Sequence, residues 1–190
     1  MPGSTPNRGY PYPLYTDPND FPSDIEDLAV AVDADVEALD NAIQAGYNRD
    51  SARVSGPIGG TQAIPTGAAG ATVTYNLEEY DNAGMADLGV TNDRITYQQA
   101  GFYLVTAHVR FAPGPNTTFG IFAALTSTGT LVGQPAVMSR QGHNTRDTNL
   151  TVTAIEFANS AGDTTRLVVG HNAGVNVNVT RCSLSATLLS

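Results

Sequence analysis

Over most of the chain after residue 71, apolar side chains recur at every second position, and this alternation constrains the fold most strongly. Val73, Tyr75 and Leu77 alternate with polar residues, and the segment 101–111 is apolar on both faces. Further strands are expected, with turn residues between them, at 62–64, 94–97, 119–125, 131–138, 149–157, 166–170, 175–179 and 181–189. Many short period-two segments predict an all-β sandwich or barrel.

A different period marks residues 23–46, where we predict a helix. Ser23 and Glu26 form a capping box at its start, and Gly46 is suited to end it. Apolar residues recur there at alternating spacings of four and three, which is a heptad seam: Ile25, Ala29, Val32, Val36, Leu39 and Ile43. Because β-branched residues stand at both seam positions, the pattern favours a parallel trimeric coiled coil. A helix packed on its own domain remains the alternative.

Residues 1–22 form a segment rich in proline and tyrosine, and prolines there favour extended backbone over helix. Disordered tails are usually poor in aromatics, whereas this segment carries Tyr10, Tyr12, Tyr15 and Phe21. We therefore expect an extended arm that anchors the chain on a partner, with a disordered tail as the alternative. Residues 47–70 are expected to be a linker containing a first short strand, and residues 71–190 to form the β-rich head.

The charge balance argues against several partners. The net charge is −9, and all nine basic residues are arginine. Such a chain presents no basic stripe for nucleic acid or for anionic lipid, so neither nucleic acid nor membrane is an expected partner. The N-terminus has no signal-peptide pattern and no apolar run is long enough to span a membrane, so assembly in a cytoplasm is expected.

Signatures of chemistry are few, and a non-enzymatic protein without metal or cofactor is expected. The single cysteine, Cys182, excludes an internal disulfide and is expected to be a buried strand residue. His108, His143 and His171 have no metal-binding spacing. There is no nucleophile elbow and no phosphate-binding loop. Only one carboxylate cluster leaves hydrolysis of a polysaccharide open: Glu78, Glu79, Asp81 and Asp87.

Three ordered motifs resemble those of the C1q/TNF-like jelly roll. Ile95-Thr96 followed by Ala100-Gly101-Phe102-Tyr103-Leu104 is similar to the family's central strand, although Gln99 stands where proline is usual. Ser160-Ala161-Gly162-Asp163 before Leu167-Val168-Val169 resembles its late hairpin. Leu184-Ser185-Ala186-Thr187-Leu188-Leu189 resembles its last strand, with Ala186 in place of glycine. The resemblance implies an antiparallel jelly-roll sandwich over 71–189 that assembles as a homotrimer.

The N-terminal segment resembles the start of minor tail proteins of actinobacterial phages, in YPYP at 10–13 followed by the pattern DPNDFPSDIEDLAVAVDADVEAL. This resemblance implies a bacteriophage virion protein, either a trimeric tail fibre or minor tail protein that attaches to the host surface. Residues 1–22 would then anchor it to other virion proteins. A head fibre or capsid decoration protein is the alternative, and a polysaccharide depolymerase is a third possibility.

Strand alternation predicts which loops share one end of such a sandwich. Counting back from the last strand, the loops 112–118, 139–148 and 171–178 should lie at the end away from the chain's point of attachment. They are polar and rich in asparagine, which suits hydrogen bonds to a host surface glycan, although ordinary solvated loops would look the same. The candidate attachment residues are Asn116, Arg140, His143, Asn144, Arg146, His171 and Asn172.

Overall fold

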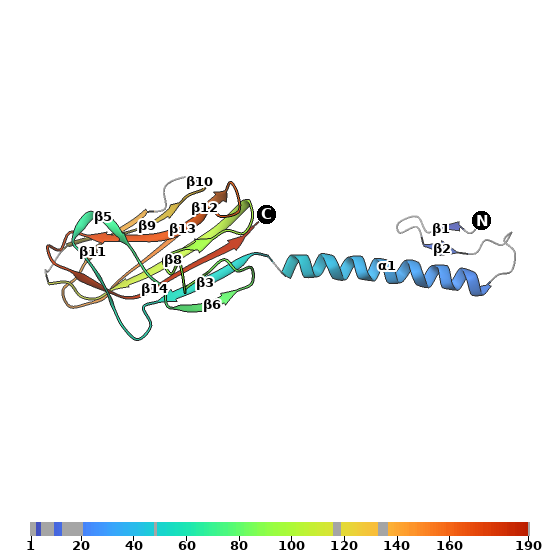
Figure 1. The fold of residues 1–190 in the computed structure, drawn as a ribbon, viewed down its shortest axis with the longest axis horizontal. Helices are drawn as coiled ribbons and strands as arrows, with labels where there is room; N and C mark the ends of the chain where they lie inside the picture. Colours follow the sequence, from blue (N-terminus) through green and yellow to red (C-terminus); the bar gives the residue numbers. More distant parts are fainter. Residues whose placement is uncertain are drawn as a thin grey trace. The chain divides into compact units, whose positions relative to one another are not determined.

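The protein divides into two compact units, residues 1–48 and 49–190 (Figure 1). The structure is a computed structural model, and it describes residues 3–4, 10–12, 21–47, 49–115, 119–132 and 137–189. The first unit holds the helix, and the second unit is the head, which is built almost entirely from strands.

The N-terminal unit contains α1 (Phe21–Tyr47) and two very short strands, β1 (Gly3–Ser4) and β2 (Pro11–Tyr12). The helix begins two residues earlier than expected, because Pro22 is tolerated in a first helical turn, and it ends one residue beyond Gly46. Ser23 is therefore inside the helix and not its N-cap. The N-terminal arm is also not simply extended, since β1 and β2 pair antiparallel as a hairpin.

The head is a sandwich of two antiparallel sheets (Figure 1). The seven-stranded sheet has the order β10-β12-β8-β14-β3-β6, with β4 also pairing with β14. Its strands are β3 (Ser51–Gly56), β4 (Gln62–Ile64), β6 (Leu77–Asp81), β8 (Gly101–Phe111), β10 (Thr130–Val132), β12 (Thr148–Ala158) and β14 (Val177–Leu188). The five-stranded sheet has the order β11-β9-β13-β5, with β7 pairing with β13. Its strands are β5 (Gly67–Thr72), β7 (Ile95–Thr96), β9 (Phe119–Ser127), β11 (Val137–Gly142) and β13 (Thr164–His171).

The core lies between the two sheets and follows the period-two pattern of the strands. Strand β8 turns every second side chain inward, and all five inward residues are at most 1% exposed: Tyr103, Val105, Ala107, Val109 and Phe111. Its other face is turned outward, so Phe102 and Leu104 remain about two-fifths exposed, at 41% and 42%. One apolar face of this strand therefore packs in the core, whereas the other apolar face is open to solvent.

The segment 47–70 is not a linker, which corrects the expected boundary of the head. Strand β3 pairs with β14 along its whole length, and Ala52 and Val54 are fully buried. Small residues in this stretch suggested a spacer, but much of it forms the strands β3, β4 and β5. The head therefore starts at Arg49 and not at residue 71.

The strand expected over 72–77 is also absent, because here the chain crosses from one sheet to the other. Strand β5 belongs to the five-stranded sheet and β6 to the seven-stranded sheet. Between them, the amide of Val73 bonds to Leu167 of one sheet and the amide of Asn76 to Ser55 of the other. Val73 and Tyr75 are buried in this crossing segment, so the alternation of apolar and polar residues here reflects burial and not strand pairing.

The expected bounds of three further strands also differ from the structure, because the sequence does not show which strands a segment pairs with. The strand expected over 131–138 is two strands, β10 and β11, which lie in different sheets. The strands expected over 175–179 and 181–189 are instead largely one strand, β14 (Val177–Leu188), whose pairing with β8 is irregular between Val179 and Arg181.

Candidate functional surfaces

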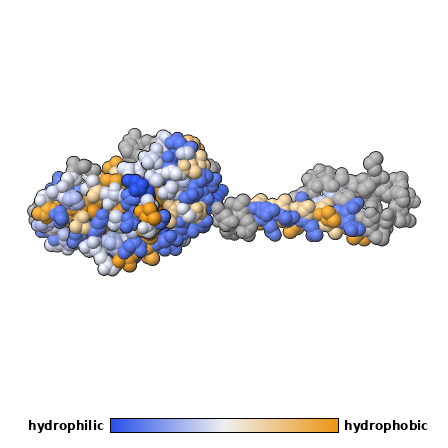
Figure 2. Space-filling view, viewed as in Figure 1, coloured by the Kyte–Doolittle hydropathy of each residue, from blue (hydrophilic) through white to orange (hydrophobic). Residues whose placement is uncertain are grey.

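The heptad seam of α1 is exposed to solvent along the part of the helix whose side chains are described. Ile25 is 60% exposed, Val36 53% and Leu39 59%, and Ala29, Val32 and Ile43 are exposed as well. Figure 2 shows hydrophobic residues along this helix. Solvent-exposed apolar residues at heptad spacing are what a self-associating helix presents before it meets its partners.

The arm residues are only partly described. The hydroxyl of Tyr10 donates a hydrogen bond of 2.6 Å to the carboxylate of Asp35 on α1. Tyr12 lies in β2, which contacts the helix, and Phe21 is the first residue of α1, whereas Tyr15 lies outside the described residues. Tyr10 thus lies against the chain's own helix. Anchoring of the arm on another protein stays a prediction.

The three candidate loops do lie at one end of the head. Ser51 at the start of β3 pairs with Thr187 near the end of β14, which defines the end of the sandwich where residue 49 lies. At the opposite end Phe111 pairs with Thr148 and with Val179, and Phe119 pairs with Gly142. The loops that follow β8, β11 and β13 therefore share this far end, called the tip below. Asn116 lies outside the described residues.

His171 is not available at the tip, which corrects its assignment as an attachment residue. It is 2% exposed, and its Nε2 lies 2.8 Å from the carbonyl oxygen of Ile64. Its Nδ1 accepts a hydrogen bond from the amide of Ala173, and its ring makes edge contacts with Phe111 and Phe119. With Nδ1 as acceptor, Nε2 carries the proton and donates to Ile64. Both ring nitrogens are therefore used inside the head.

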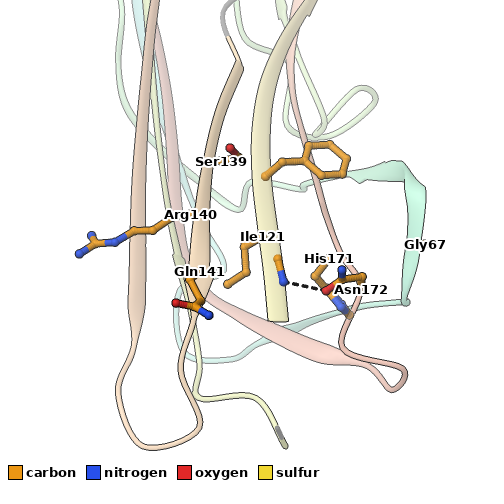
Figure 3. A pocket seen from close by; sticks show the side chains of 9 residues that line it. Gly67, Ile121, Ser139, Arg140, Gln141, His171 and Asn172 are labelled. Carbon is orange, nitrogen blue, oxygen red and sulfur yellow. Dashed lines mark hydrogen bonds between the residues drawn. The ribbon is translucent and has the colours of Figure 1, made fainter. Parts of the chain in front are cut away.

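The other candidate residues reach the surface. His143 and Arg146 are exposed and Asn144 is half-buried, and Nδ1 of His143 accepts a hydrogen bond from the amide of Thr145. Arg140 and Asn172 line an open hollow of about 560 Å³ on the five-stranded sheet (Figure 3). The carboxamide oxygen of Asn172 is held by the amide of Gly120 at 2.7 Å, and Arg140 extends away from it.

An apolar patch lies on the outward face of the seven-stranded sheet, at the end where residue 49 lies. Leu104 pairs with Ile155, and Phe102 pairs with Phe157, with their ring centroids 4.9 Å apart. Phe102, Leu104 and Ile155 are each about two-fifths exposed, and Phe157 is half-buried. We call these four residues the base patch. The sequence marked β8 as apolar on both faces, but it did not show that one of those faces is open to solvent.

Further toward the tip, the same sheet face is polar and carries three arginines. Arg53, Arg110 and Arg181 lie around two adjacent hollows that share Arg181. Burial lowers the pKa of His108, and the nearby Arg181, Arg110 and Arg53 lower it further, against a hydrogen bond with Asn149 that raises it. His108 is thus a half-buried surface residue in a positive environment.

Three of the four carboxylates in the acidic cluster make structural contacts, and the fourth, Glu78, is exposed on β6. Asp81 accepts hydrogen bonds from the amides of Ala83, Met85 and Ala86. Asp87 accepts from the next turn, and Glu79 forms an ion pair with Arg53 at 2.9 Å. Among the residues that the structure describes, no group of three or more histidine, cysteine or acidic side chains is placed to hold a metal ion. Cys182 is fully buried, as expected, and burial raises the pKa of its thiol to about 12.

The sequence reasoning missed the buried carboxyl group of Glu156. Glu156 is fully buried between the sheets, where Tyr97 and Thr165 donate hydrogen bonds to its carboxylate at 2.6 and 2.9 Å. Burial and the adjacent Glu156 raise the pKa of Tyr97 well above its usual value. The period of the strand could have predicted that Glu156 is buried, because Glu156 is in phase with the inward residues Leu150 and Val152.

Comparisons with known proteins place the head by its fold. No protein-family model matches the chain, and no curated protein is similar to it in sequence. Murine APRIL, solved at pH 5.0, matches with a TM-score of 0.53 and 12% identity, over 74% of this chain and 99% of that one. The globular domain of zebrafish complement 1qA protein matches with a TM-score of 0.48 and 15% identity, over 75% and 98%. Eiger TNF from S. frugiperda matches with the same score and identity, over 75% and 93%.

The head is therefore a mainly β, antiparallel jelly-roll sandwich preceded by one helix. Its fold is the C1q/TNF-like jelly roll, as the sequence motifs predicted. No helix in the described part of the chain is both long and apolar enough to cross a membrane.

Proposed function

We propose that this protein is a non-enzymatic bacteriophage virion protein, a homotrimeric minor tail or tail-fibre protein that contacts the host surface with the tip of its head. The observation that carries self-association is the exposed heptad seam of α1. Three of its residues are more than half exposed in the single chain, although burying an aliphatic side chain is worth about 1.5–3 kcal/mol. Packing against two further copies of the same helix removes that surface from water.

The base patch supports the same assembly from the head. Its aromatic pair and two aliphatic side chains form a contiguous apolar surface on one sheet face. Contiguous exposed apolar patches mark interaction sites, and a patch repeated on identical chains can pack about a rotation axis. The helix and the head thus each offer a surface for the same partner, a second and third copy of this chain.

The attachment role rests on the tip. The loops there are polar, and their accessible candidate residues are His143, Asn144, Arg146 and Asn172, while Arg140 lies on the adjoining strand β11. Guanidinium groups donate hydrogen bonds to glycan hydroxyls, and amide and imidazole groups can both donate to them and accept from them. The virion assignment itself rests on the resemblance of residues 17–39 to phage minor tail proteins, with assembly in the bacterial host cytoplasm.

Sedimentation of the full-length chain tests the trimer. The wild type is expected to sediment as a trimer at micromolar concentration, and Val36→Asp is expected to weaken self-association at least tenfold, because a carboxylate cannot be buried in the seam without cost. Val30→Asp is the matched control, since Val30 is 64% exposed but lies off the seam. A monomeric wild type, or equal effects of the two substitutions, contradicts the proposal.

Electron microscopy of virions with a labelled antibody against the head tests the location. Label on the tail supports the minor tail role, and label on the capsid supports the decoration protein instead. Substituting Arg140 and Arg146 together by alanine is expected to reduce adsorption of the purified protein to host cells, whereas Arg49→Ala, at the other end of the head, is not. Undiminished adsorption of the double variant contradicts attachment through the tip.

A further inference from the structure

The smaller hollow on the seven-stranded sheet has the features of a built site. Its volume is about 310 Å³, and its lining includes Arg53, Ser55, Glu79, His108, Arg181 and Ser183. Ser55 pairs with Ser183, and Ser183 pairs with His108, so these three residues form a row across β3, β14 and β8. Residues directly opposite each other on neighbouring strands point to the same face of a sheet. Two hydroxyls and an imidazole therefore line up on the outward face, with arginines beside them.

Ser55 provides an independent sign that the hollow takes a ligand. The residue is only 4% exposed, and its hydroxyl has no hydrogen-bond partner within the described part of the protein. Buried polar atoms without a partner are uncommon in folded proteins, because each one costs about 1–3 kcal/mol. The Ser55 side chain lines the hollow although its oxygen has almost no accessible surface, so a rotation about its Cα–Cβ bond would bring the hydroxyl to a ligand there.

The positive charge around the hollow indicates that the ligand is an anion. Three of the nine arginines of a chain with net charge −9 gather here. Arg53 is paired with Glu79 and Arg110 with Asp147. Arg181 makes no ion pair with a described residue, so its positive charge is not neutralised by a neighbouring carboxylate. Arg53 and Arg181 line the hollow together with His108, whose pKa is lowered by burial and then by these neighbouring charges.

We propose that this hollow binds a small oxyanion, a phosphate or sulfate group, through the guanidinium of Arg181 and the hydroxyls of Ser55 and Ser183. Guanidinium and hydroxyl donors are the groups that hold tetrahedral oxyanions in proteins, and charge-assisted hydrogen bonds of this kind are about twice as strong as neutral ones. Glu79 does not oppose the anion strongly, because Arg53 neutralises it at 2.9 Å. His108 completes the floor and becomes easier to protonate when the anion is bound.

The site goes beyond the proposed attachment role and does not depend on it. It lies on β3, β14 and β8 of the seven-stranded sheet, whereas the polar loops assigned to attachment are at the tip. The phosphate group that the site would bind can come from two sources, free inorganic phosphate or a phosphodiester polymer. Measurements with both separate them.

Histidine-selective NMR of the full-length protein in its assembled state is the direct test. The chain has three histidines, and His108→Gln and His143→Gln identify their signals. At constant ionic strength, we expect inorganic phosphate up to about 10 mM, ten times a Kd of about 1 mM, to shift the His108 signal saturably and to raise the pKa of His108. The His143 signal should not follow. Absence of a saturable shift at His108, or an equal shift at His143, overturns the proposal.

Variants connect the shift to the proposed ligands. Arg181→Gln and Ser55→Ala are each expected to weaken phosphate binding at least tenfold, and Arg140→Gln, on the other sheet, is expected to leave it unchanged. The signal of the buried His171 reports that each variant is folded. Unchanged affinity in folded Arg181→Gln overturns the proposal. Tighter binding of a glycerol-phosphate polymer than of inorganic phosphate identifies the polymer as the source, and binding of inorganic phosphate alone identifies the free ion.

Discussion

The hydroxyl of Tyr97 donates a hydrogen bond of 2.6 Å to the carboxylate of Glu156 in the interior of the sandwich. Glu156 belongs to β12 of the seven-stranded sheet, and its other oxygen accepts from Thr165 on β13 of the five-stranded sheet at 2.9 Å. The ring of Tyr97 stacks on Tyr103 with centroids 4.1 Å apart. One buried carboxylate thus links the two sheets through directional hydrogen bonds, whereas apolar packing between the sheets has no directionality.

Replacing Glu156 should destabilise the head more than replacing a surface glutamate. Glu156→Ala leaves the hydroxyls of Tyr97 and Thr165 buried without their acceptor, at an expected cost of about 2–4 kcal/mol. Glu78→Ala, at an exposed position on β6, should change stability by less than about 0.5 kcal/mol. Denaturant unfolding of both full-length variants measures the difference, and equal midpoints would show that the buried cluster adds nothing to stability.

Truncation of His171 should cost much more stability than truncation of His143. His171→Ala removes a bond to Ile64 and two aromatic edge contacts, so we expect a loss of about 2–3 kcal/mol. His143 is exposed, and His143→Ala should cost less than about 0.5 kcal/mol. Thermal unfolding compares the two variants. A stable His171→Ala protein would contradict the structural role given to this residue.

The base patch should act in self-association of the head. Ile155→Asp places a carboxylate within the patch, and we expect it to lower the dissociation temperature of the proposed trimer or to favour the monomer in sedimentation. Ile58→Asp is the matched control, because Ile58 is similarly exposed, at 47% against 41%, but lies in the loop after β3. If both variants assemble like the wild type, the patch is not an interface between copies.

Stability should fall in mild acid because of His108. Its pKa in the folded head lies below the ordinary value of 6.5, chiefly through burial and then through the three arginines. Below about pH 6.5 the unfolded chain therefore takes up a proton that the folded head accepts only at lower pH, and protonation favours unfolding in this window. Melting curves at about pH 7.5 and 5.5 should show a smaller acid-induced decrease for His108→Gln than for the wild type. A larger decrease in the variant would reverse the sign and refute this explanation.

Much of the head could be read from the sequence because strand periodicity is a local property. The segment 101–111 was placed with its correct ends, and 62–64 was found as a short strand, since apolar alternation and flanking turn residues are visible in the chain itself. The helix was placed within two residues at each end for the same reason. The three family motifs then predicted the jelly roll, and the structure has it.

The wrong expectations share one cause, which is that local patterns do not show which sheet a segment joins. The segment 72–77 alternates like a strand because Val73 and Tyr75 are buried, but it crosses between the sheets. The glycine-rich stretch before it looked like a spacer, although β3 and β5 pair within it. Pairing partners lie far away along the chain, so only the folded chain identifies them.

By itself, the sequence determined the class of this protein: a heptad helix followed by an antiparallel β head with many period-two strands. Those features depend on side-chain spacing of 3.5 and 2 residues, which is written in the chain. Only the tertiary structure decided that His171 is buried, that Glu156 joins the two sheets, and that Ser55, Ser183 and His108 lie in one row. The physical reason is that these relationships depend on strand register, and register brings together residues that are distant in sequence.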